Sequence, residues 1–168
     1  MTESAMLPLP DLLQSLLTLL EEAYPGPPDP GATWFIDNEP DAGILGTIKG
    51  VTAAEASVSM DGSGKPGTTI ASNVEHLRWS LANVNNTLRG GEYSPDWRAS
   101  WTVVEEDEAG WDRLRGELRR EYEDLCEAIP RVQALDEVWL NGMLALIPHA
   151  AFHLGLVRQM IERVRAQK

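Results

Sequence analysis

The most constraining feature of this sequence is a regular repeat of apolar residues within 69–89, in alternating steps of four and three. The repeat consists of Ile70, Val74, Leu77, Leu81, Val84 and Leu88. This spacing places apolar side chains along one face of an α-helix and leaves the opposite face polar. Such a helix buries its apolar face only by packing against other elements, so the repeat predicts a helical bundle.

Three further stretches have the spacing and composition of helices, at 11–24, 107–129 and 136–165. Prolines directly follow the first two, and proline ends a helix because it lacks a backbone N–H. The segments 42–49 and 52–57 are candidates for short connecting helices, and no stretch alternates for long enough to build a sheet. The sequence therefore predicts an all-α fold, a four-helix bundle with short connector helices.

The size and charge of the chain narrow its class. A length of 168 residues fits a single domain over residues 1–168. Fourteen basic against 26 acidic side chains give a net charge of −12, which repels phosphate backbones and anionic lipids. The single Cys126 excludes an intrachain disulfide framework, and the leucine-rich start lacks the basic residues of a signal peptide. We expect a cytoplasmic protein that binds neither nucleic acid nor membranes.

The predicted last helix contains an uncharged stretch, 139–157, that has no Asp, Glu, Lys or Arg over 19 residues. That length alone would suffice to cross a membrane. Asn141, Pro148 and two histidines argue against a lipid environment, where unpaired polar groups are costly. We therefore expect this helix to be the most buried of the four.

The chain has three histidines, His76, His149 and His153. The last two are four residues apart, so they lie on one face of the predicted last helix. His76 lies at the edge of the apolar face of the 69–89 helix, beside polar residues. Three neutral imidazoles from two helices can hold a divalent metal and leave a coordination position open, as in catalytic sites. Imidazole nitrogen suits zinc, nickel, iron or copper, so the ligands do not select the metal.

The spacing of the histidines also fits a role without metal. Histidines four residues apart occur on many helices, where they pack in the core or face solvent. The chain lacks the glutamate of the H-E-x-x-H motif, so a metalloprotease is not predicted. The residues by themselves leave metal ligation and ordinary packing both open.

Three segments are similar to the DinB/YfiT-like superfamily of metalloenzymes. They are TTIASNVEHLRWSLANV at 68–84, DWRASWTVVEEDEAGWDRL at 96–114 and GMLALIPHAAFHLGLVRQMIERV at 142–164. The resemblance follows the order of the family over about residues 9–165, and it is loose over 25–60. It implies a four-helix bundle that is often a homodimer.

The resemblance also implies the ligands and the class of reaction. His76 would be the ligand from the second helix and His149 and His153 the pair from the fourth, around zinc, nickel or iron. Characterised relatives include bacillithiol-using S-transferases and mycothiol-dependent isomerases. The resemblance thus implies a transferase that joins a low-molecular-weight thiol to a small-molecule substrate. The alternatives are a metal-dependent hydrolase and a non-catalytic metal-binding stress or interaction protein.

Five other residues are candidates for supporting roles. Asn73 and Asn83 are candidates to donate hydrogen bonds around the ligating histidines. Trp79 and Trp139 are candidates for lining the site, and Arg158 for orienting an anionic cofactor. For these last three, ordinary packing or surface exposure is the favoured interpretation. The sequence predicts no general base.

Overall fold

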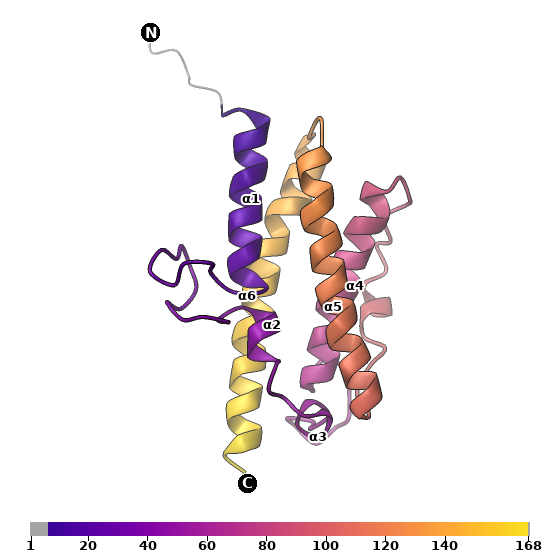
Figure 1. The fold of residues 1–168 in the computed structure, drawn as a ribbon. Coiled ribbons are helices and arrows are strands. Elements are labelled where there is room, and N and C mark those ends of the chain that lie inside the picture. The colour runs from indigo at the N-terminus through magenta and orange to yellow at the C-terminus, as the bar shows by residue number, and fades with distance from the viewer. Residues whose placement is uncertain (1–6, 168) are drawn as a thin grey trace.

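The computed structural model describes residues 7–167, and every regular element within this range is helical. The elements are α1 (Leu9–Ala23), α2 (Ile44–Thr47), α3 (Ala53–Ala56), α4 (Ile70–Leu88), η1 (Trp97–Ser100), α5 (Glu108–Ala128), η2 (Ile129–Arg131) and α6 (Glu137–Arg165). The four long helices α1, α4, α5 and α6 run side by side (Figure 1). The all-α prediction is confirmed, and the predicted helices agree with the observed bounds to within about two residues.

Side-chain caps fix where three of the four long helices begin. Thr69, Asp107 and Asp136 each accept a hydrogen bond from a backbone N–H in the first turn of α4, α5 and α6, respectively. The first turn of a helix has N–H groups without intrahelical partners, and such caps satisfy one of them. These residues lie in polar connectors immediately before the apolar repeats, which explains why the repeats located the helices so closely.

The apolar core lies among the four long helices and takes side chains from each of them. Its largest fully buried members include Trp111, Leu16, Leu20, Leu77, Leu81, Leu118 and Leu125. The indole Nε1 of Trp111 donates a hydrogen bond of 2.7 Å to the carbonyl of Val51. The connector that follows α2 is thereby tied to the core by a satisfied polar group.

The expectation that α6 is the most buried helix is wrong. Val138 and Phe152 on α6 are 79% and 67% exposed, whereas α4 has buried residues on most of its circumference. α6 is less buried because it packs mainly against α1, α2 and α4, and its remaining face is uncovered. By length and composition α6 could span a membrane, but core helices of soluble proteins pass the same test, so this is weak evidence.

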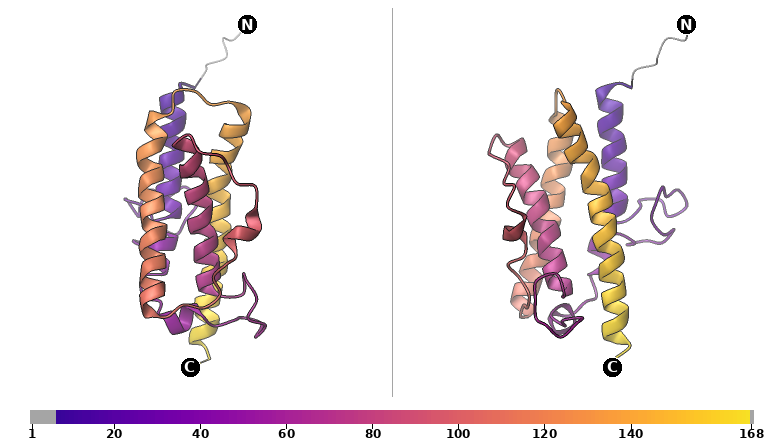
Figure 2. Two further views of the ribbon diagram at one scale, coloured as in Figure 1. Left: turned by 90° about the vertical axis from the view of Figure 1, so that its right-hand side faces the viewer. Right: turned by 180° about the vertical axis from the view of Figure 1, so that it is seen from behind.

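The segment between α4 and α5 determines the surroundings of the candidate site. It descends beside α4, with η1 midway along it (Figure 2). Asn83 on α4 holds its upper part, because the side-chain amide donates to the Ser94 carbonyl at 2.7 Å and accepts from the Ser94 N–H at 2.8 Å. Asn83, predicted to support a histidine, therefore anchors this segment instead.

Candidate metal centre

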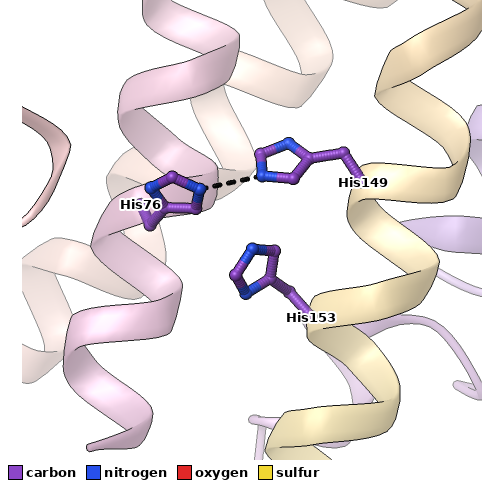
Figure 3. Close-up of side chains that lie close together, drawn as sticks. All are labelled: His76, His149 and His153. Carbon is purple, nitrogen blue, oxygen red and sulfur yellow. Dashed lines mark hydrogen bonds between the residues drawn. The ribbon is translucent and has the colours of Figure 1, made fainter. Parts of the chain in front are cut away.

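The three histidines predicted from the sequence lie together in the structure. His76 projects from α4, and His149 and His153 project from successive turns of α6 (Figure 3). One ring nitrogen from each lies within 4.8 Å of the others. A search of the histidine, cysteine, aspartate and glutamate side chains of the described residues finds this group of three histidines as one that could hold a metal ion.

The ring orientation of His76 is fixed by Ser100 of η1. The Nδ1 of His76 lies 2.6 Å from the Ser100 Oγ, and that hydroxyl donates to the Trp97 carbonyl at 2.6 Å. Since the hydroxyl hydrogen is used on the carbonyl, the network assigns the imidazole hydrogen to Nδ1. The Nε2 lone pair of His76 is left free to face the other histidines.

Asn73 does the same for His153. Its Oδ1 accepts a hydrogen bond of 2.9 Å from the Nδ1 of His153. Its Nδ2 donates to the carbonyls of Gly67 at 3.1 Å and Thr69 at 2.8 Å, which fixes the orientation of the amide. Asn73 therefore supports a ligating histidine as predicted, but as an acceptor and not as a donor, and the Nε2 of His153 is left as a free acceptor.

The third histidine is held more loosely. The Nδ1 of His149 lies 3.5 Å from the Ser80 Oγ, at the limit of a hydrogen bond. Its Nε2 lies 2.9 Å from the Nε2 of His76. Two ring nitrogens this close need a proton or a cation between their lone pairs. Pro148 does not prevent this approach, because α6 continues through it.

Burial keeps the three imidazoles neutral. Burial, followed by the proximity of His149, lowers the pKa of His76 to about 4. Burial, followed by the proximity of His149 and His76, lowers the pKa of His153 to about 3. The pKa of His149 is also lowered by burial. A metal ligand must be the unprotonated form, so the set is ready to bind a cation at neutral pH.

The distances suit a small divalent cation. Metal–nitrogen bonds of about 2.0–2.1 Å place ligand nitrogens about 3.3 Å apart in a tetrahedral site. The observed separations, 2.9 Å for the closest pair and at most 4.8 Å within the set, bracket that value. Three protein ligands leave at least one position for a further ligand. All three ligands are neutral, so a bound dication would keep its charge.

Aromatic rings surround the histidines. Trp101 stacks on His76 with ring centroids 4.0 Å apart and an interplanar angle of 13°. Trp97 lies 5.6 Å from His76 and 5.9 Å from His149, and Phe152 lies 5.1 Å from His153. These contacts place apolar surface on several sides of the ligand nitrogens.

Some neighbours predicted from the sequence lie elsewhere. Trp79 packs on Trp97, with ring centroids 5.4 Å apart, and so belongs to the surroundings of the site. Trp139 lines a different cavity, near the start of α6. Arg158 pairs with Asp37 and donates to a backbone carbonyl at the base of the 24–43 loop.

Sequence reasoning did not single out Ser100, Trp97 or Trp101 as part of the site. They come from a connector whose path a sequence pattern does not define. The available signal was the pair of tryptophans four residues apart with a serine between them, in an otherwise polar segment.

No protein-family model, curated protein or solved structure matches this chain.

Proposed function

We propose that this chain is a DinB/YfiT-like four-helix bundle that binds a divalent transition metal through His76, His149 and His153. The observation that carries the proposal is the convergence of three neutral imidazoles whose Nδ1 atoms face other partners. Buried polar side chains are costly unless they are paired, so a purely structural role would favour rings with both nitrogens satisfied. Here the Nε2 atoms of His76 and His149 share one hydrogen bond, and the Nε2 of His153, which faces the same point, has no hydrogen-bond partner among the described residues.

The order of the elements supports the family assignment. Of the four long helices, the second supplies one histidine and the fourth supplies the pair four residues apart. The segment before the third long helix carries the spaced tryptophans on which the resemblance also depends. The homodimer and the cytoplasmic location expected from the sequence are part of the same proposal.

The proposed activity is the transfer of a low-molecular-weight thiol to an electrophilic small molecule. A divalent cation held by the three histidines would lower the pKa of a thiol and so favour the thiolate near neutral pH. The thiolate sulfur attacks the electrophilic carbon, a C–S bond forms, and the bond to the leaving group breaks. The leaving group keeps the electron pair of that bond, and the thiol proton passes to solvent.

The residues of the chain have separate roles in this proposal. The three histidines hold the cation, while Ser100 and Asn73 keep the hydrogens on Nδ1 and thus direct two Nε2 atoms inward. No carboxylate belongs to this cluster among the described residues. A cation held by the histidines would therefore keep its positive charge and attract an anionic thiolate.

The test compares metal-loaded wild type with His153→Ala. Each protein, loaded with zinc, nickel or iron, is mixed with a small thiol and 1-chloro-2,4-dinitrobenzene, and chloride release is measured. The proposal predicts a rate above the uncatalysed reaction in the wild type alone. Equal rates for both proteins with every metal would contradict thiol transfer. Hydrolysis of an ester without added thiol would instead support the metal-dependent hydrolase.

A further inference from the structure

Two aromatic side chains, Trp97 and Phe152, contact the histidine cluster, and Trp79 packs on Trp97. We call these three side chains the aromatic rim. Trp97 is 42% exposed and Phe152 is 67% exposed, although both contact histidine rings. Exposed aromatic rings usually mark binding surfaces when they gather at one place. Trp97 lies against the half-buried His149, the most accessible of the three histidines, and Phe152 lies against the buried His153.

The position of Trp97 is coupled to the cluster through its own backbone. Its carbonyl accepts the hydrogen bond from the same Ser100 hydroxyl that receives the Nδ1 hydrogen of His76. Asp96 caps η1 by accepting from the Arg98 N–H at 3.1 Å. The backbone of Trp97 is therefore held beside the cluster, and its indole ring lies 5.9 Å from the ring of His149 at an angle of 87°.

We propose that the centre takes a planar, apolar ligand, neutral or anionic, whose donor atom approaches the three Nε2 atoms while its ring packs against the aromatic rim. This inference rests on the proposed metal site and names the substrate class for it. Aromatic faces favour a planar group by stacking or edge contacts. They would also attract a planar cation, but an adjacent dication with no carboxylate partner repels one.

The test uses the protein loaded with cobalt(II), whose visible absorption responds to a new ligand. Imidazole and 4-phenylimidazole present the same donor nitrogen, but only the second carries a planar apolar group. We expect the wild type to bind 4-phenylimidazole about five- to tenfold more tightly than imidazole. In Trp97→Leu the preference should fall to within about twofold.

Trp34→Leu is the matched control, because Trp34 is 77% exposed on the 24–43 loop, on the other side of the molecule from η1 (Figure 2). It should keep the full preference for 4-phenylimidazole. Phe152→Leu is a second test on α6, where the exposed ring can be removed without disturbing the core. It should reduce the preference without changing the cobalt content.

The outcomes separate this inference from the metal site itself. A wild type that shows no cobalt absorption would overturn the proposed function, and this inference with it. A cobalt protein that binds both ligands equally, or keeps its preference in both Trp97→Leu and Phe152→Leu, would overturn the aromatic rim alone.

Discussion

The two sides of α4 differ in what they bury. The side toward α5 and the core carries Leu77 and Leu81, which are fully buried in apolar surroundings. The side toward α6 and η1 carries Asn73, His76 and Ser80, which are also buried but polar. Apolar burial stabilises a fold directly, whereas polar burial contributes little even when each group is paired. The comparison indicates that the apolar side of α4 stabilises the fold, and that the polar side positions the side chains of the candidate site.

The largest effect should follow from Leu77→Ala on the core side. Removing a fully buried leucine costs about 2–5 kcal/mol through lost burial and the cavity left behind. Chemical denaturation of the metal-free protein should show this loss. The zinc content of the folded variant should equal that of the wild type, and a loss of zinc would mean that the two sides are not separable.

A smaller effect is expected from Ser100→Ala on the other side. The substitution removes the acceptor for the His76 Nδ1 hydrogen, and losses of such supporting partners typically weaken metal binding about 10–100-fold. Competition with a chelator of known affinity measures the change. Unchanged affinity would show that Ser100 does not orient His76.

The pH dependence of stability sharpens the comparison further. The pKa of His76 is about 4 in the folded protein, against an ordinary value of about 6.5 in the unfolded chain. Between these pH values the unfolded chain binds more protons than the folded protein. The contribution of His76 to the free energy of unfolding is therefore present above about pH 6.5 and is lost as the pH falls toward 4. We expect metal-free wild type to lose stability on the order of 1–3 kcal/mol over this window from His76 alone.

The double variant His76→Gln/His153→Gln provides the control for this pH effect. Glutamine does not titrate, so the loss between pH 6.5 and 4 should become distinctly shallower. The measurement is the free energy of unfolding in urea at several pH values. Identical slopes in the variant and the wild type would show that the histidines titrate normally in the fold.

The smallest effect is expected from Ser80→Ala. The Ser80 Oγ lies 3.5 Å from the His149 Nδ1, compared with 2.6 Å for the contact between Ser100 and His76. So long a contact contributes little, and metal affinity should change by less than about threefold. A loss as large as that in Ser100→Ala would mean that the contact shortens when metal binds.

The sequence predicts the helices and the ligand set well because both depend on local spacing. The repeat from Ile70 to Leu88 defines α4, and the four-residue step from His149 to His153 defines a shared helix face. That His76 would meet this pair also required the two helices to be neighbours, which the resemblance implied.

What the sequence could not predict depends on long-range placement. Ser100 and Trp97 reach the site because their connector descends beside α4, and no periodicity encodes that path. The exposed face of α6 was missed for a similar reason. An uncharged stretch is compatible with burial, but burial requires a neighbour, and none covers Phe152 in the described structure.

The central claim is that the polar side of α4 and the facing turns of α6 form a metal site. The most direct test is elemental analysis of metal per chain, on protein purified without an affinity tag or chelator, for wild type and His149→Ala/His153→Ala. We predict about one divalent metal per wild-type chain and almost none in the variant. Absence of metal from both, even after incubation with zinc, nickel and iron, would contradict the claim.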